Sequence, residues 1–312
     1  MSVYTEVSAA DLQPLLADFQ AGVLLELTGI RDGIENTNYF VRTEQGEFVL
    51  TLFEILAEPE IHFTLSFMAH LVEQGLPFAR PLCNREGKYL SRLHGKPTSL
   101  VTRLEGQSQL EVGPAHCQAI GQTLASMHLA GHSFRQAHNN SRGEAWRRKM
   151  QQTLRPHLGA PQQAMLDDEI AYQHHAYDQL PRGIIHSDLF RDNALFTGEQ
   201  LTGLLDLYDA GHDLLLYDLA ITATDWCSEP DGAFEPVRLQ ALLRAYHAVR
   251  PITEEEQQAW PVLLRRAALR FWLSRLYSQL YPREGHLTQE KDPLVYQQML
   301  EYYRQHPQPW PI

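Results

Sequence analysis

The sequence predicts an α+β fold, in which an antiparallel five-stranded sheet within residues 1–104 precedes a larger, mainly helical part, residues 105–312. Short runs rich in β-branched and aromatic residues recur between positions 22 and 105. After Pro114, apolar residues recur mainly at helical spacing. Polar side chains with metal-binding chemistry gather in 183–211, at the ends of short apolar runs. We therefore expect one sheet-rich and one helix-rich lobe.

The first element predicted is a short amphipathic helix over residues 8–19. Ser8 is suited to cap its N-terminus, and Asp11 follows three residues later. Pro14 lies inside this stretch and is expected to kink or restart the helix, because proline lacks the backbone N–H and crowds the preceding turn.

Five strands and a second helix are expected in the remainder of this lobe. Three strands read as residues 23–30, 37–43 and 46–54, with Gln45-Gly46 as a hairpin turn. Residues 88–106 add two strands joined at His94-Gly95. The intervening helix runs from Pro59 to Gly75, with glycine and Pro77 ending it.

Helices dominate the second part. Pro114 opens one that Gly131 ends, and a second runs from about 161 to 180. His128 and His132 are four residues apart, but no glutamate accompanies them as in a zinc motif, so core or surface histidines are the better interpretation.

Later in the chain, further helices are indicated. Asp218, on the buried helix expected at 215–227, is predicted to brace a neighbouring loop through backbone N–H groups. Thr253 and Glu256 form a capping box for a following helix that continues to about 281. Residues 307–312 are Pro-rich and predicted to be irregular.

The segment 183–211 carries the chemistry. Ile184-Ile185 reads as a buried strand that delivers His186-x-Asp188-x-x-x-x-Asn193 to a turn. Two more short strands follow, and Asp206 ends the second. A His-x-Asp pair can simply stabilise a turn. Here, however, the flanking strands would bring Asp188, Asn193 and Asp206 together, as phosphoryl transfer requires. One carboxylate accepts a hydroxyl proton, while an amide oxygen and a second carboxylate hold Mg²⁺.

This segment resembles the catalytic and metal-binding loops of the aminoglycoside phosphotransferase and choline kinase group, which are relatives of protein kinases. More narrowly, six blocks are similar to the homoserine kinases built on that fold: ENTNYFV, EFVLTLFE, HSDLFRDNALF, LTGLLDLYDAG, LLYDLAITATDWC and RFWLSRL. They lie in order from about 35 to 276. The resemblance implies a bilobal protein-kinase-like fold, with a nucleotide-binding lobe at 1–104 and a catalytic, substrate-binding lobe at 105–312.

In such folds the hairpin between the first two strands covers the ATP phosphates. Glycines there allow close backbone approach, and polar side chains supply donors. Backbone groups of a hinge after the fifth strand bond the adenine edge. The residues so implied for nucleotide binding are Gly29, Gly33, Asn36, Thr37, Asn38, Thr51, Thr102 and Leu104.

Thr51 departs from the general kinase pattern. It stands where phosphotransferases usually place a lysine that holds the nucleotide phosphates. A neutral hydroxyl cannot replace that charge, so Arg31 or Arg42 substitutes, or Mg²⁺ and backbone donors carry more of the load. The homoserine kinases resembled here share the substitution, and the departure fits that narrower group.

The resemblance implies transfer of the ATP γ-phosphoryl group to L-homoserine, a step in threonine biosynthesis. Asp188 would act as the base and His186 would fix the loop, while Asn193 and Asp206 would hold Mg²⁺. An amino-acid alcohol also needs an arginine fork for its carboxylate and carboxylates for its ammonium group. The candidates for these substrate contacts are Arg270, Arg275, Asp209 and Asp225.

Composition excludes several other classes. The 312 residues include 26 Lys plus Arg and 38 Asp plus Glu, giving a net charge of −12, which argues against a general nucleic-acid binder. Cys83, Cys117 and Cys227 form no C-x-x-C motif. No signal peptide or membrane-spanning run is evident, so a cytoplasmic location is expected.

Two alternatives stay open at this stage. A related kinase could act on choline, methylthioribose, an aminoglycoside or a protein Ser/Thr, and Trp226, Trp272 and Tyr277 would suit a choline ammonium group. A pseudokinase is the other alternative, favoured by Thr51 and opposed by Asp188, Asn193 and Asp206. The exact acceptor, the choice of ATP or GTP, the replacement cation and the oligomeric state are not determined by the sequence.

Overall fold

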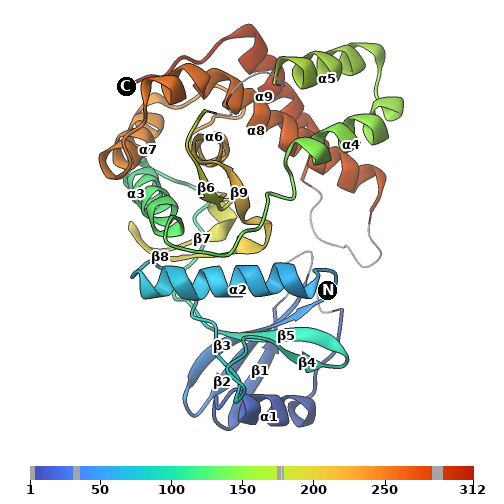
Figure 1. Cartoon of the computed structure of the whole chain (residues 1–312), viewed down its shortest axis with the longest axis vertical. Helices are drawn as coiled ribbons and strands as arrows, with labels where there is room; N and C mark the ends of the chain where they lie inside the picture. Colours follow the sequence, from blue (N-terminus) through green and yellow to red (C-terminus); the bar gives the residue numbers. More distant parts are fainter. Residues whose placement is uncertain (1–3, 31–35, 174–176, 178, 283–290) are drawn as a thin grey trace. The chain divides into compact units, whose positions relative to one another are not determined.

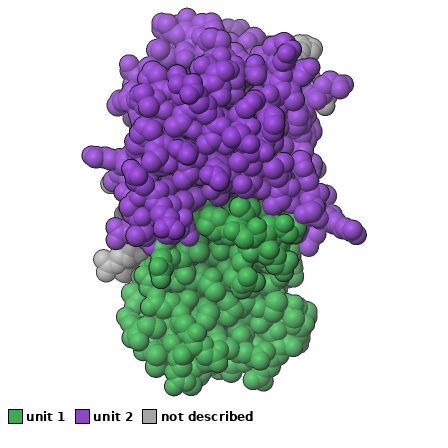
Figure 2. All heavy atoms as spheres, turned by 90° about the vertical axis from the view of Figure 1, so that its left-hand side faces the viewer, with its two compact units in different colours: residues 1–105, 203–208, 282–289 green, residues 106–202, 209–281, 290–312 purple. Residues whose placement is uncertain are grey.

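The computed structural model describes residues 4–30, 36–173, 177, 179–282 and 291–312. The chain divides into two compact units (Figure 2). The first contains the described residues of 1–105, together with 203–208 and Pro282. The second contains 106–202, 209–281 and the described C-terminal residues.

The first unit is built on a five-stranded antiparallel sheet of order β1-β2-β3-β5-β4, which confirms the predicted sheet (Figure 1). In the register of β2 and β3, Asn38 faces Thr51 and Arg42 faces Glu47. His94 and Gly95 join the last two strands with φ of 50° and 77°, the left-handed pair that a tight hairpin turn requires. The strands span Leu24–Gly29 (β1), Asn36–Thr43 (β2), Gly46–Phe53 (β3), Ser91–Leu93 (β4) and Lys96–Thr102 (β5).

Two helices pack on this sheet. Helix α1 (Ala9–Asp18) begins with the predicted Ser8 capping box and continues through Pro14, so the expected restart is wrong. Helix α1 covers one face of the sheet (Figure 1), and its buried leucines share a hydrophobic core with Val41 and Leu50. Helix α2 (Glu58–Glu73) instead packs its Ile61 and Leu65 on Phe53.

The segment 203–208 returns to the first unit late in the chain. The Leu204 N–H donates to Pro77 O at 2.8 Å, and Thr64 Oγ1 donates to Leu207 O at 3.4 Å. Tyr208 meets the Phe53 ring edge to face, with centroids 5.4 Å apart. Short parallel pairing between Phe78 and Leu204 completes the attachment. Residues distant in sequence therefore complete this unit.

The second unit is mainly helical and also contains short strands that flank the loop of His186, Asp188 and Asn193. Strand β6 (Arg182–Ile185) pairs antiparallel with β9 (Gly211–Leu214), and β7 (Ala194–Thr197) pairs with β8 (Gln200–Leu204). The α-helices are α3 (Pro114–Gly131), α4 (Glu144–Leu154), α5 (Ala160–Tyr172), α6 (Leu215–Trp226), α7 (Pro236–Val249), α8 (Glu254–Leu280) and α9 (Pro293–Gln305).

Several of these helices follow the predictions and one does not. Helix α3 matches its predicted bounds, and Thr253 and Glu256 form the predicted capping box of α8. Helix α5 ends at Tyr172, so the predicted end at Leu180 is wrong. No glycine or proline marks that end in the sequence. None of the helices among the described residues combines the length and apolar character needed to cross a membrane.

Candidate active site

The loop after β6 is held in an unusual backbone conformation. Ile184 and Ile185 are buried and deliver His186, Ser187 and Asp188 to the loop. Ser187 has a φ of 72°, in the left-handed region that non-glycine residues rarely adopt. Such a conformation persists only where surrounding contacts hold it, and it is common at functional sites.

Helix α6 supplies those contacts. The fully buried Asp218 carboxylate accepts the backbone N–H groups of His186 at 2.6 Å and Ser187 at 2.8 Å. Near the end of the helix, Asp225 accepts the Arg191 N–H at 2.8 Å, and the Trp226 indole donates to Leu189 O at 3.0 Å. The bracing role predicted for Asp218 is therefore confirmed.

Behind Asp218 lies a buried relay of hydrogen bonds. Arg250 Nε donates to the Tyr246 hydroxyl at 2.7 Å, the hydroxyl lies 2.7 Å from His128 Nδ1, and His128 Nε2 lies 3.0 Å from Asp218. Burial lowers the pKa of His128, which favours the neutral ring. Burial alone would raise the pKa of Asp218, but the hydrogen bonds from the His128 ring and from the His186 backbone N–H lower it overall. His128 is thus a satisfied core histidine, as predicted.

Asp188 and Asn193 come together on the loop. Asn193 Nδ2 donates to Asp188 O at 2.8 Å and lies 3.4 Å from its Oδ2. The Asp188 N–H donates to His186 Nδ1 at 3.3 Å, which is the loop-fixing contact expected of His186. Since the amide nitrogen of Asn193 faces Asp188, its Oδ1 is presented on the other side as an oxygen ligand.

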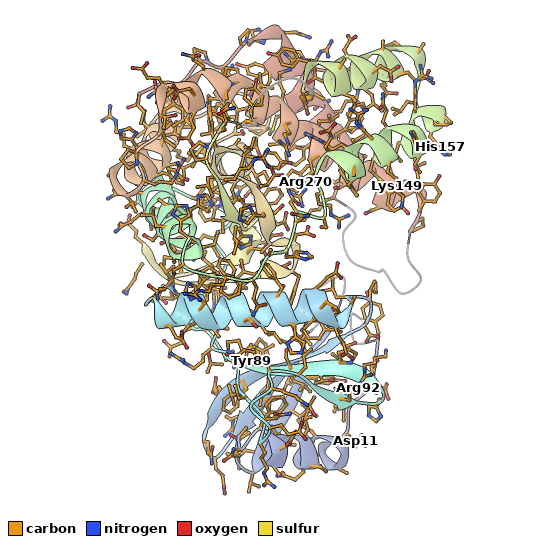
Figure 3. The ribbon with its side chains drawn as sticks, in the orientation of Figure 1. Asp11, Tyr89, Arg92, Lys149, His157 and Arg270 are labelled. Atoms are coloured by element: carbon orange, nitrogen blue, oxygen red, sulfur yellow. The ribbon has the colours of Figure 1, made fainter. Side chains whose placement is uncertain are left out.

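Arg270 lies beneath two carboxylates. Its guanidinium donates to Ser187 O and, through Nη2, to Asp209 at 2.9 Å, while Nη1 lies 3.8 Å from Asp188 Oδ1. The arginine side chain is 2% exposed, whereas those of Asp188 and Asp209 are each 29% exposed. Figure 3 labels Arg270 among the side chains of the second unit. Arg270 is therefore already paired by the protein.

Desolvation raises the pKa of the Asp188 carboxyl to about 6. The charge of Arg270 opposes this rise, and so does that of Lys291, whereas Asp209 and Asp192 add to it. Lys291 Nζ lies 2.7 Å from Asp192 and 5.5 Å from the centre of the Phe190 ring. A carboxylate whose pKa lies near neutral is well matched to accepting a proton.

The other predicted acceptor contacts are occupied within the protein. Asp225 binds Arg191, through both its backbone N–H and its Nε at 3.2 Å. Arg275 donates to Asp292 O at 3.1 Å and stacks on the Tyr296 ring. Both residues therefore brace the second unit in this structure.

Asp206 belongs to the first unit, unlike Asp188 and Asn193. It is exposed and has a φ of 60°. Among the described residues, no cluster of three or more His, Cys, Asp or Glu side chains could bind a metal by itself. Carboxylate and amide oxygens nevertheless match the preference of Mg²⁺, which commonly completes its shell with water and nucleotide phosphates. The convergence of Asp206 with Asn193 stays a prediction.

In the first unit, the predicted phosphate-facing residues divide between the two faces of β2. Asn38 Oδ1 accepts the Thr51 hydroxyl at 2.8 Å. The Thr37 hydroxyl, on the opposite face, accepts the Tyr4 and Thr5 N–H groups at 3.0 and 3.1 Å and donates to Glu54. Thr37 therefore anchors the N-terminal segment.

The remaining predicted nucleotide contacts are placed as follows. Gly29 ends β1 opposite Tyr39, and Asn36 Oδ1 accepts the Glu54 N–H at 3.4 Å. Gly33 and Arg31 lie outside the described residues. Thr102 pairs with Arg80 through both its N–H and its hydroxyl, at 2.9 Å each. Leu104 packs against Gly203, where any side chain larger than hydrogen would collide.

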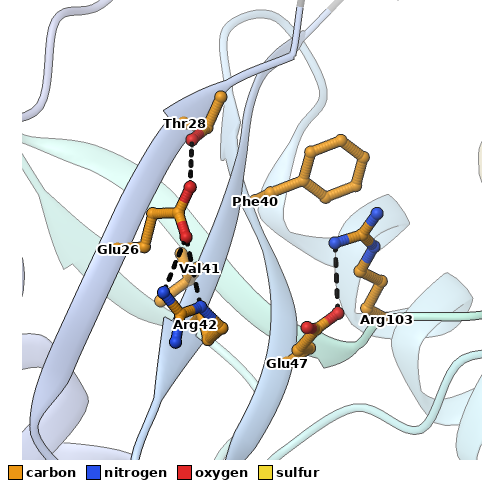
Figure 4. Close-up of a pocket in the computed structure, with 7 residues that line it drawn as sticks. All are labelled: Glu26, Thr28, Phe40, Val41, Arg42, Glu47 and Arg103. Carbon is orange, nitrogen blue, oxygen red and sulfur yellow. Dashed lines mark hydrogen bonds and ion pairs between the residues drawn. The ribbon is translucent and has the colours of Figure 1, made fainter.

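Arg42 does not lie beside Thr51. It forms an ion pair with Glu26 at 2.9 Å in a pocket of about 230 Å³, next to the Arg103–Phe40 stack (Figure 4). In the strand register, Arg42 is four residues from Asn38, a separation of about 13 Å along the strand. The proposed replacement of the missing lysine by Arg42 therefore finds no support in this geometry.

Both the fold and the sequence of the chain match those of known phosphotransferases. The structure resembles that of an amicoumacin kinase in complex with AMP-PNP, Ca²⁺ and Ami, with a TM-score of 0.70 over 96% of this chain and 95% of that one, at 15% identity. The model of the phosphotransferase enzyme family matches residues 26–252. The chain therefore belongs to the phosphotransferase enzyme family.

Curated relatives that share one specific name match the chain at higher sequence identity. The chain is 46% identical to a homoserine kinase of Methylobacillus flagellatus, over 97% of this chain and 95% of the relative. It is 43% identical to a homoserine kinase of Janthinobacterium sp. (strain Marseille), over 96% and 95% of the two chains. The similarity thus extends over nearly the whole length of both relatives.

Proposed function

We propose that this protein transfers the γ-phosphoryl group of ATP to the side-chain hydroxyl of L-homoserine. The observation that carries the proposal is the Asp188 loop, in which a carboxylate with a pKa of about 6 lies beside Asn193 and is supported by Arg270. The named relatives, which resemble the chain over almost its full length, point to homoserine as the acceptor.

In this mechanism, Asp188 orients the acceptor hydroxyl and takes its proton as the oxygen attacks the γ-phosphorus. The bond from the γ-phosphorus to the β,γ-bridging oxygen breaks, which releases ADP, and Asp188 later returns its proton to solvent. A base in this position contributes roughly 10²–10⁴-fold to the rate. His186, Asp218 and Asp225 keep the loop in position throughout.

Asn193 and Asp206 are the residues that would hold Mg²⁺. When bound, the ion neutralises charge on the nucleotide phosphates. The first unit would bind the nucleotide, with Leu104 at the hinge. Gly29, Asn36, Asn38 and Thr51 supply the surface toward the phosphates in this proposal, whereas Thr37 and Thr102 are occupied by Thr5 and Arg80.

A coupled assay of ADP release over a panel of alcohols tests the proposal. We expect Mg²⁺-dependent turnover with L-homoserine at a kcat/KM well above that for choline, methylthioribose, aminoglycosides and a Ser/Thr peptide. Identification of O-phosphohomoserine by mass spectrometry would exclude simple ATP hydrolysis. Turnover with a different alcohol alone would overturn the choice of acceptor, and none at all would favour a pseudokinase.

A further inference from the structure

An arginine that the sequence patterns did not single out lies beside the acceptor site. Arg142 belongs to the connection between α3 and α4. Its N–H donates to Asn140 Oδ1 at 2.9 Å, and Asn140 Nδ2 donates to Asp213 on β9 at 2.9 Å. The Asn140 backbone also lies tightly against Gly211, where a Cβ would come within 2.7 Å of it. These contacts fix Arg142 next to the strand that follows Asp209.

The Arg142 guanidinium forms a long ion pair with Asp209 and no hydrogen bond to it. Arg142 Nε lies 3.6 Å from Asp209 Oδ1, which is too long for a hydrogen bond. That nitrogen is buried, and it has no hydrogen-bond partner among the described residues. A buried donor without a partner costs free energy, so its presence at a binding site points to a ligand that satisfies it. The side chain as a whole is 33% exposed and thus accessible.

Asp209 is held on its other side. Its Oδ2 accepts from Arg270 Nη2 at 2.9 Å, which leaves Oδ1 facing Arg142. Arg270 also contacts the loop of Asp188. The Arg270 guanidinium therefore lies between Asp188 and Asp209 and places both carboxylates at one site. A short amino alcohol can therefore reach both at once.

We propose that Arg142 selects acceptors that carry a carboxylate: its guanidinium binds the carboxylate of an α-amino acid, while Asp209 Oδ1 binds the ammonium group. This inference rests on the proposed function and assigns the carboxylate contact that Arg270 and Arg275 do not supply. The zwitterion replaces one long ion pair with two direct charge-assisted contacts, and its hydroxyl then lies toward Asp188.

The test compares two acceptors that differ only in the carboxylate, L-homoserine and 3-aminopropan-1-ol. Each is assayed with the wild type, Arg142→Gln and Arg142→Lys. We expect Arg142→Gln to lower kcat/KM for homoserine by about 10- to 100-fold, mainly through KM, as the loss of a charge-assisted contact predicts. For 3-aminopropan-1-ol we expect a change of less than about threefold. Lysine should restore part of the difference, because it keeps the charge without the bidentate fork.

Arg148→Gln is the matched control. Arg148 lies six residues further on, on α4, and pairs with Glu144 at 2.8 Å on an exposed surface. This substitution should leave kcat/KM unchanged for both acceptors. The proposal is overturned if Arg142→Gln lowers kcat/KM equally for both acceptors, which indicates a structural role. It is also overturned if the substitution lowers kcat/KM for neither acceptor.

The acceptor panel separates this inference from the proposed function. If the wild type prefers another hydroxy acid, such as L-serine, and Arg142→Gln removes that preference, the choice of homoserine fails while the role of Arg142 stands. A preferred acceptor without a carboxylate overturns the role of Arg142. If no alcohol is phosphorylated, calorimetric titration with L-homoserine decides, and equal binding to the wild type and Arg142→Gln overturns the inference.

Discussion

The surroundings of Asp188 give its carboxyl group a pKa well above that of an ordinary aspartate. An exposed aspartate titrates near 3.9, whereas desolvation raises the pKa of this one to about 6 in spite of Arg270. The loop therefore keeps a base that is largely deprotonated at neutral pH yet basic enough to accept a proton. Loss of this carboxylate should lower kcat far more than it lowers the affinity for ATP.

Asp188→Asn should lower kcat by about 10²–10⁴-fold, because the amide keeps the shape of the side chain but cannot accept the hydroxyl proton. ATP affinity, measured by calorimetry, should change little. Asp168→Asn, at an exposed carboxylate of α5, is the control. A variant that retains full turnover would remove Asp188 from the role of base.

The pH dependence of kcat/KM should report the same group. The base must be deprotonated, so activity should fall as the pH drops through about 6. Lys291 lowers the pKa of Asp188, so Lys291→Ala should move this acidic limb to higher pH. Lys88→Ala is the control, because the exposed Lys88–Glu86 ion pair has the same length, 2.7 Å, as the Lys291–Asp192 pair. This control should leave the acidic limb in place. A shift to lower pH would contradict the assigned electrostatics.

At the scale of elements, α6 acts as the support of the active loop. Its side chains at 218, 225 and 226 all bond the 186–191 segment, and the relay behind Asp218 continues this support through Tyr246 to Arg250. A buried network of this kind is stable only while each member is paired.

Two buried tyrosines make a matched pair for testing that network. Tyr246→Phe removes a hydroxyl that joins Arg250 to His128, and it should lower the free energy of unfolding by about 1–3 kcal/mol because buried partners lose their hydrogen bonds. The Tyr217 hydroxyl has no such partner among the described residues, so Tyr217→Phe should be near neutral. Urea denaturation measures both changes. Equal losses would show that the relay adds no stability.

Elements with regular patterns could be predicted from the sequence, and those with mixed patterns could not. The β2–β3 hairpin joins two runs rich in β-branched and aromatic residues at a Gln45-Gly46 turn, and α3 carries proline and glycine signals at its ends. Helix α4 has no regular apolar spacing from which it could be predicted, because its buried face is Arg147, Met150 and Leu154 and thus includes a cation. Arg147 packs there beside Gln173.

In the candidate site too, residues placed by local sequence spacing could be predicted, and residues placed by contacts distant in sequence could not. The Asp188–Asn193 pair follows from spacing within one loop, and Asp218 follows from its place on a buried helix. Arg142 carries no comparable signal, because its position depends on Asn140 meeting β9, some 70 residues away. Asp225 and Arg275 had the right charge for the acceptor, but nearby residues bind both. Partner choice among charged side chains depends on the tertiary fold.

At the scale of the whole molecule, neither unit is one continuous stretch of the chain. Asn193 lies in the second unit and Asp206 in the first. If both hold the same ion, phosphoryl transfer depends on both units together, and the two residues must be energetically coupled.

A double-mutant cycle tests this coupling. Asn193→Ala and Asp206→Asn should each raise the Mg²⁺ concentration needed for half-maximal rate, and the double variant should lose less than the sum of the two effects on a free-energy scale. Removal of Mg²⁺ with EDTA should abolish turnover of the wild type. Strict additivity would indicate that the two residues act independently and would contradict a shared ion.

The attachment of residues 203–208 to Pro77, Thr64 and Phe53 also has a practical consequence for protein engineering. A gene fragment that ends at residue 105 would leave Phe53 without Tyr208 and Pro77 without its bonding partner. We expect such a truncated piece to aggregate when expressed alone. A peptide spanning 200–210, supplied in trans, should improve its recovery in soluble form. Split reporters or chimeras made from this enzyme should therefore keep that hexapeptide with the unit it completes.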